Sequence, residues 1–118
     1  KIKLLSSAEI AYKEALRLQP RNSAVWSNLG LVYSEAGEFE QAYEALKKAK
    51  QLSGGLDHAV YANIGITHEF QGQHEQALAA YRKGFQLAPA IDFYREKVEF
   101  LREKLAQERS GTLKTVQE

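Results

Sequence analysis

The sequence repeats itself at intervals of 34 and 35 residues, and this period limits the folds that the chain can form. One set of matched positions occurs three times, as Ala8, Tyr12, Ala15 and Pro20, then Ala42, Leu46, Ala49 and Gly54, then Ala77, Tyr81, Gly84 and Pro89. A second set occurs twice, as Trp26, Leu29, Gly30 and Tyr33, then Tyr61, Ile64, Gly65 and His68. A period of this length is typical of repeat proteins, in which each unit buries its apolar face only by stacking on its neighbour.

Long segments of the chain space their apolar residues by three and four positions and are rich in alanine, leucine, glutamate and lysine. This pattern is typical of amphipathic helices. It predicts helices over about residues 5–18, 23–36, 39–52, 58–71, 74–87 and 91–108. Residues suited to helix ends stand at these boundaries, with Asn22 or Ser23, Asp57 and Asp92 as N-terminal caps and Gly37 and Gly72 as C-terminal glycines. Residues 110–118 show no periodicity and are predicted to form a flexible tail.

The two copies that contain both helices of a unit carry a specific motif. The first copy reads Trp26-x2-Leu29-Gly30-x2-Tyr33, followed by Ala42 and Leu46. The second copy reads Tyr61-x2-Ile64-Gly65-x2-His68, followed by Ala77, Tyr81 and Pro89, and it departs from the first at His68. These residues resemble the tetratricopeptide-repeat family over about residues 6–89.

The resemblance implies an all-α fold, a right-handed superhelical stack of antiparallel helix hairpins with a C-terminal capping helix. It implies one domain over residues 1–109. This domain divides into the second half of a repeat (1–22), two full repeats (23–56 and 57–90) and the capping helix (91–109).

Small side chains at matched positions indicate where helices approach closely. Gly30 is predicted to face Ala42 within one hairpin and Gly65 to face Ala77 within the next, because small residues let two helix backbones come together. Ala15, Ala49 and Gly84 are predicted to do the same between successive hairpins. The last helix places Tyr94, Val98, Leu101 and Leu105 on one stripe, which is predicted to pack on the helix before it.

Composition argues against several classes of function. The chain has 16 basic and 15 acidic residues and a net charge of +1, so it lacks the basic stripe of a nucleic-acid-binding protein. No apolar run approaches the ~18 residues of a membrane span. Cysteine is absent, and His58, His68 and His74 lack the i, i+4 spacing of a helical metal site. The sequence therefore predicts no enzyme, cofactor or metal. A site built from His68, His74 and Glu75 is the alternative, and a packing role for His68 is favoured over it.

The resemblance implies a concave groove lined by the first helix of each hairpin. The groove positions are predicted to be Ala24, Ser27, Asn28, Leu31, Ser34 and Glu35 in one repeat, Ala59, Ala62, Asn63, Ile66, Glu69 and Phe70 in the next, and Phe93, Lys97 and Phe100 in the capping helix. Asn28 and Asn63 are predicted to hold the backbone of an extended peptide, since a carboxamide both donates and accepts hydrogen bonds. The alternative is that asparagine is merely common and exposed at these positions. Leu31, Ile66, Phe70, Phe93 and Phe100 are predicted to contact apolar side chains of a partner. The alternatives are that Phe93 and Phe100 are core residues of the capping helix, or that the chain's own tail covers them.

The groove lacks the basic residues by which some family members grip acidic C-termini of chaperones. Ser27, Ala59 and Asn63 stand at those positions, and Lys97 is the only base. The predicted partner is therefore another protein or peptide, with no nucleic acid and no membrane insertion.

The first predicted helix lacks the helix that should precede it. Either the array continues upstream, which we favour, or a second chain covers Ile10 and Leu4. The second possibility makes the chain a self-associating module, and the sequence leaves its compartment open.

Overall fold

A computed structural model of the chain describes residues 6–117, with side chains described for residues 6–111. It contains six helices, and no strand lies in the described range: α1 (Ser7–Leu18), α2 (Ser23–Glu35), α3 (Phe39–Leu52), α4 (His58–Phe70), α5 (His74–Leu87) and α6 (Asp92–Gln117). The all-α prediction is confirmed, and the bounds of the first five helices differ from the predicted ones by no more than about two residues. Leu4 and Glu118 lie outside the described residues.

Short polar side chains start the helices as expected from the sequence. The Asn22 Oδ1 atom accepts a hydrogen bond from the backbone N–H of Val25 at 3.2 Å, and the Asp57 Oδ1 atom accepts one from Ala59 at 3.0 Å. Asp92 is instead the first residue of α6, where its carboxylate pairs with Arg95 at 3.1 Å. Each such cap satisfies a backbone donor that the helix itself leaves unpaired.

Turns after α2 and α4 each use one glycine in the left-handed region. The φ angle is 77° at Gly37 and 69° at Gly72, a conformation that costs other residues a Cβ clash. The backbone N–H of Glu38 then reaches back to the Tyr33 carbonyl at 2.8 Å, and that of Gln73 reaches the His68 carbonyl at 2.9 Å. Both hairpins therefore close through the same turn.

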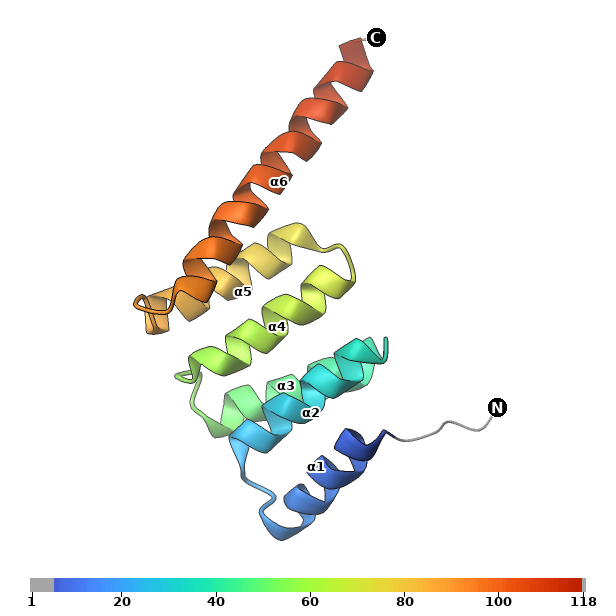
Figure 1. The fold of residues 1–118 in the computed structure, drawn as a ribbon, viewed down its shortest axis with the longest axis vertical. Coiled ribbons are helices and arrows are strands. Elements are labelled where there is room, and N and C mark those ends of the chain that lie inside the picture. The colour runs from blue at the N-terminus through green and yellow to red at the C-terminus, as the bar shows by residue number, and fades with distance from the viewer. Residues whose placement is uncertain (1–5, 118) are drawn as a thin grey trace, which may run out of the picture.

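The last helix is longer than predicted. It was expected to end near residue 108 with a flexible tail over 110–118, but α6 continues to Gln117. The segment contains no proline, and an established helix gains one hydrogen bond for each residue added, so the single Gly111 does not end it. Figure 1 shows the C-terminal part of α6 running past the end of α5.

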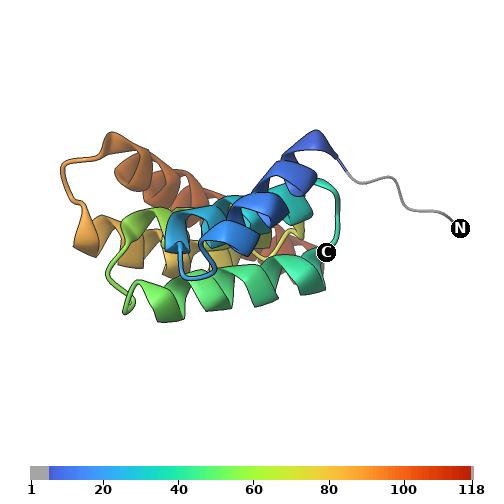
Figure 2. The same cartoon turned by 90° about the horizontal axis from the view of Figure 1, so that it is seen from below.

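The helices stack as hairpins in two layers. In Figure 1, α1 lies at one end of the stack, followed by the α2/α3 and α4/α5 hairpins and then α6, with α2 and α4 in front of α3 and α5. Figure 2 shows α3 and α1 on opposite sides of α2. The molecule is 20 Å thick in its shortest direction, which is about two helix diameters of ~10 Å.

Glycines allow the closest approaches between helices. A methyl group added at Gly30 would lie 2.6 Å from Cγ of Leu46 and 3.2 Å from the Ala42 carbonyl oxygen, which confirms the predicted contact between Gly30 and Ala42. A methyl group at Gly65 would instead meet the Tyr81 ring at 2.5 Å. Side chains of Ala42, Leu46 and Tyr81 are at most 1% exposed, so these contacts form the core.

The predicted packing of the apolar stripe of α6 is also confirmed. A methyl group at Gly84 would meet the Tyr94 ring at 2.3 Å, so α6 closes on α5 through the same kind of contact. Tyr94 and Leu101 are buried with Ala77 and Tyr81, and Val98 and Leu105 pack against this cluster.

Candidate functional site

The seam between α2 and α4 is polar and fully occupied by contacts within the chain. The Asn63 Nδ2 atom donates hydrogen bonds to the Ser27 Oγ atom at 2.8 Å and to the Ser27 carbonyl at 3.2 Å. One to two turns further along, the Oγ atom of Ser34 lies 2.5 Å from the Oγ1 atom of Thr67. Ser27, Ser34 and Thr67 are at most 3% exposed. The prediction that Ser27 and Ser34 line the groove is therefore wrong, because these side chains fill the seam between two parallel helices.

The hydrogen bonds made by the Ser34 and Thr67 hydroxyl groups indicate which of the two donates across the seam. Each contacts the carbonyl four residues earlier, Ser34 at 3.1 Å from Gly30 and Thr67 at 2.7 Å from Asn63. A hydroxyl group has one hydrogen, so only one of them can donate across the seam. The shorter contact of Thr67 with its own carbonyl favours Ser34 as the donor. This pair fixes the C-terminal ends of α2 and α4 relative to each other.

Asn28 and Asn63 occupy matched positions but differ in their surroundings. Asn63 is half-buried, and its amide nitrogen is engaged by Ser27. Asn28 is exposed, because no parallel helix precedes α2 among the described residues. Of the two predicted peptide-binding carboxamides, Asn28 is therefore the accessible one.

One face of α2 and the matching face of α4 remain open beside the seam. The helical rotation of 100° per residue places Asn28, Leu31 and Glu35 on one stripe of α2 and Ile66 with Phe70 on one stripe of α4. Leu31 and Ile66 are half-buried, whereas the side chain of Phe70 is 54% exposed. The middle of the α2 stripe is therefore apolar through Leu31, and that of the α4 stripe through Ile66.

The contact between α4 and α6 contains a salt bridge set in aromatic rings. The Lys97 Nζ atom lies 3.0 Å from Oε1 of Glu69, and it also lies 5.8 Å from the ring centroid of Tyr81 and 5.9 Å from that of Phe93. The Tyr81 hydroxyl donates a hydrogen bond to Glu69. Burial raises the pKa of Tyr81, and the Glu69 carboxylate raises that pKa further. Lys97, the predicted base of the groove, is thus neutralised within the chain.

The two phenylalanines of α6 have different surroundings. Phe93 is half-buried and packs edge-to-face on Tyr81 and Tyr94, with ring centroids 5.7 and 5.4 Å apart. Phe100 is 53% exposed. For Phe93 the structure supports the core alternative in part, while Phe100 remains available at the surface.

All three histidines connect neighbouring helices. The His68 Nδ1 atom lies 2.9 Å from the Tyr43 hydroxyl of α3 and 2.8 Å from Oε1 of Gln73, which as an amide oxygen can only accept. The other two histidines bind α6, His58 through the Tyr94 hydroxyl at 2.6 Å and His74 through Glu108 at 2.7 Å. In the part of the chain with described side chains, no three histidine, aspartate or glutamate residues are placed to hold a metal ion.

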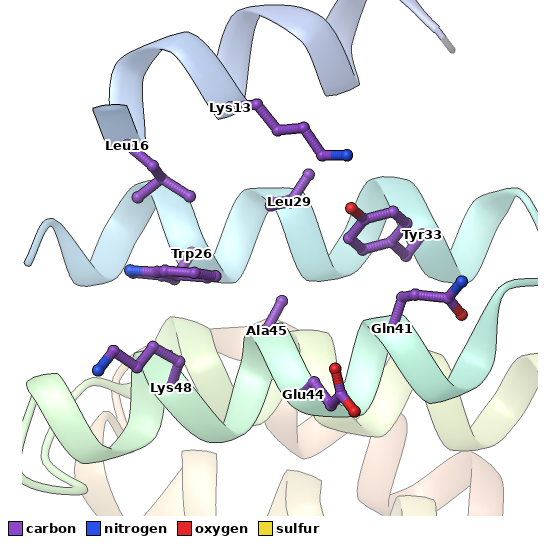
Figure 3. A pocket seen from close by; sticks show the side chains of 9 residues that line it. All are labelled: Lys13, Leu16, Trp26, Leu29, Tyr33, Gln41, Glu44, Ala45 and Lys48. Carbon is purple, nitrogen blue, oxygen red and sulfur yellow. The ribbon is translucent and has the colours of Figure 1, made fainter. Parts of the chain in front are cut away.

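A pocket of about 510 Å³ lies between α1, α2 and α3. Figure 3 shows Trp26, Leu29 and Tyr33 along α2, with Leu16 and Lys13 approaching from α1 and Ala45 from α3. These α2 residues face away from the stripe that carries Asn28 and Glu35. The Lys13 Nζ atom at the pocket edge forms an ion pair with the buried Glu9 carboxylate at 3.1 Å, and hydrogen bonds to Glu9 and Tyr33 raise the pKa of Lys13.

Sequence reasoning did not identify this pocket, the Ser34–Thr67 pair or the burial of Glu9. A signal existed for Glu9, which stands 34 residues before Tyr43. Tyr43 contacts His68 between α3 and α4, and Lys13, one turn after Glu9, lies over Tyr33 between α1 and α2. Glu9 and Tyr43 therefore occupy matched positions of the repeat, Glu9 at the contact between α1 and α2 and Tyr43 at the contact between α3 and α4.

Comparison with known proteins agrees with this architecture. A family model described as tetratricopeptide repeat matches residues 22–96, which is more than half of the chain. No curated protein matches the sequence. In the part of the chain that the structure describes, none of the helices has the length and apolar character to cross a lipid bilayer.

Proposed function

Because the chain belongs to the tetratricopeptide-repeat family, whose repeats generally act in protein–protein interaction, we propose that it binds a segment of a partner protein along α2, α4 and α6. We call this surface the groove and define it by two sets of side chains: the exposed Asn28, Glu35, Phe70 and Phe100, and the half-buried Leu31, Ile66, Phe93 and Lys97. Asn63 borders the groove from the seam. Repeats of this kind are typically scaffolds, and we expect no enzymatic activity.

The observation that carries this proposal is the exposure of Phe70 and Phe100. They are 54% and 53% exposed on helices of the groove, beside the half-buried Leu31 and Ile66. Burying a large apolar side chain from water stabilises a complex by roughly 1.5–3 kcal/mol for complete burial. An apolar side chain of a partner that covers these rings gains part of this free energy.

Although Asn28 and Asn63 occupy matched positions, only Asn28 is free to bind a partner with its whole carboxamide group. Asn28 is open and can pair with the backbone of a bound segment through both its amide and its carbonyl group. The Asn63 amide nitrogen already donates hydrogen bonds to Ser27. Replacing Asn63 therefore weakens the seam as well as any contact with a partner. The pairing of Lys97 with Glu69 supports the expectation that acidic C-termini are not the preferred ligand.

The proposal is tested by selecting displayed random peptides on the full chain. Selected peptides should lose binding at least ~10-fold when Phe70 and Phe100 are both changed to serine. Phe85→Ser is the matched control, because Phe85 is 38% exposed on α5, outside the groove. Equal loss in the control, or retention of binding by the double variant, would show that the groove is not the binding surface.

A second candidate function is self-association through α1. Ala42 and Ala45 of α3 are 0% and 3% exposed, whereas Ala8 and Ala11, 34 residues earlier, are exposed along with Ile10 at 55%. The chain should then sediment as a dimer at high concentration, and Ile10→Ser should restore the monomer. A monomer across all concentrations argues against this function.

A further inference from the structure

The groove helices carry an unusual distribution of charge. Neither α2 nor α4 contains a lysine or arginine, and their only acidic residues, Glu35 and Glu69, stand in their last turns. The helices behind them are rich in bases, namely Lys47, Lys48 and Lys50 in α3 and Arg82 and Lys83 in α5. The open faces of α2 and α4 are therefore neutral except at their acidic C-terminal ends.

Glu35 is placed where an acidic side chain destabilises its own helix. It is the last residue of α2, where the backbone carbonyls already give the helix end a partial negative charge. The last turn of α2 holds no base, and among the described residues no hydrogen bond or ion pair reaches the exposed Glu35 carboxylate. A residue that breaks a local rule without compensation within the fold points to a contact outside it.

Glu69 shows how the same arrangement is satisfied elsewhere in this chain. Its carboxylate also lies in the last turn of a groove helix, but Lys97 from the neighbouring α6 pairs with it at 3.0 Å. The stem of Lys97 lies over the rings of Tyr81 and Phe93, so one side chain supplies both charge and apolar contact. No helix of the described chain does this for Glu35.

An apolar contact site lies beside Glu35. The 35-residue offset of the repeat puts Phe70 of α4 at the position that Glu35 has in α2. The Ser34–Thr67 contact at 2.5 Å holds these two helix ends side by side, so the two positions are about one helix spacing apart, ~10 Å. The pair therefore presents a carboxylate and an exposed aromatic ring on one surface.

From this juxtaposition we infer that the partner segment carries a lysine or arginine close to a large apolar side chain, with the base on Glu35 and the apolar group on Phe70. This inference rests on the proposed function and adds the chemistry of the ligand to it. In an extended segment each residue advances ~3.3 Å and side chains on one face recur at every second residue, so a base and an apolar group two or four residues apart, ~7 or ~13 Å, bracket this distance. The bound base also relieves the repulsion between Glu35 and the end of α2.

The test uses random 12-residue peptides displayed on phage and selected on the full chain. Peptides that bind the wild type but not the Phe70→Ser variant should be enriched in lysine or arginine two or four residues from a large apolar residue. A synthetic peptide from this set should bind the Glu35→Gln variant about 2–5-fold more weakly at low salt, and the Glu35→Lys variant more weakly still. Both differences should shrink as the salt concentration rises to ~0.15 M, because dissolved ions weaken the interaction between exposed charges.

Two controls make the result specific. The same peptide with its base changed to glutamine should bind wild type and Glu35→Gln equally. Glu44→Gln changes an exposed acid of α3, outside the groove, and should leave binding unaltered.

The two proposals fail in different ways. If no selected peptide depends on Phe70, the groove itself is not the binding surface. If peptides depend on Phe70 but carry no excess of bases and ignore Glu35→Gln, the groove stands and the inference about basic ligands is overturned. Concentration-dependent self-association that Glu35→Gln abolishes would also overturn it, because a second copy would then be the occupant.

Discussion

The hairpins α2/α3 and α4/α5 both pack a large side chain of the second helix against a glycine of the first, and they differ in which side chain this is. In both, a glycine of the first helix admits a large residue of the second, Leu46 against Gly30 and Tyr81 against Gly65. Leu46 adds only apolar volume. Tyr81 adds a hydroxyl group that binds Glu69, which in turn pairs with Lys97 of α6. The repeat therefore fixes the small residue, while its large partner determines whether a hairpin is joined to the next helix by polar contacts.

The strongest test of this comparison is to replace each glycine with alanine. In Gly65→Ala the new methyl group meets a buried aromatic ring 2.5 Å away, which cannot bend aside. In Gly30→Ala it meets Leu46, whose side chain has more freedom to adjust. We expect the free energy of unfolding to fall by ~2–3 kcal/mol for Gly65→Ala and by ~1 kcal/mol for Gly30→Ala, after the gain in helix propensity. Urea denaturation measures both.

The matched control for these variants is Gly111→Ala. Its added methyl group would meet no atom within 4 Å, so the change should leave stability equal or slightly higher. Equal losses for Gly30→Ala and Gly65→Ala would show that the two contacts are equally rigid.

The tyrosines of the second half should make it sensitive to alkaline pH. Burial raises the pKa of Tyr94 to about 12, above the ~10 of an unfolded chain. A raised tyrosine pKa means that stability is fully present below pH ~10 and is lost as the pH rises toward 12. We expect a loss of up to ~2–3 kcal/mol from this group, and Tyr94→Phe should reduce the loss over that interval. Urea denaturation between pH 9 and pH 12 tests this, and identical pH profiles would contradict it.

The sequence predicted the repeat architecture well because small residues at fixed spacing leave few packing arrangements. Gly30 against Ala42 and the apolar stripe of α6 were both visible in the periodicity. The groove was less predictable, since the exposure of a residue depends on its neighbouring helix. Ser27 and Ser34 read as surface residues, and only the parallel approach of α4 buries them. Asn28 and Asn63 match in sequence, but among the described residues only the Asn63 side chain is directed at a parallel neighbouring helix.

That difference between the asparagines gives a third test. Asn63→Ala removes the donor to Ser27 in the seam and should lower the free energy of unfolding by ~1 kcal/mol. Asn28→Ala removes an exposed side chain and should change it by less than ~0.5 kcal/mol. Peptide binding should respond in the opposite order, with Asn28→Ala acting without loss of stability. Equal stabilities of the two variants would mean that the seam hydrogen bond contributes nothing.

The smallest expected changes in stability concern the two acidic residues at the ends of α2 and α4. The two substitutions are expected to change stability in opposite directions. Glu69→Gln removes the ion pair with Lys97, and we expect it to destabilise the chain by ~0.5–1 kcal/mol. The Lys97 side chain is 33% exposed and the Glu69 side chain is 22% exposed. Glu35→Gln removes a negative charge from the end of α2, where no base of the described residues pairs with it, and should stabilise the chain by ~0.3–1 kcal/mol. Thermal unfolding at low salt resolves the two shifts. A stability loss in both variants would mean that Glu35 already has a partner within the fold, and the argument that its partner is a base on another molecule would fail with it.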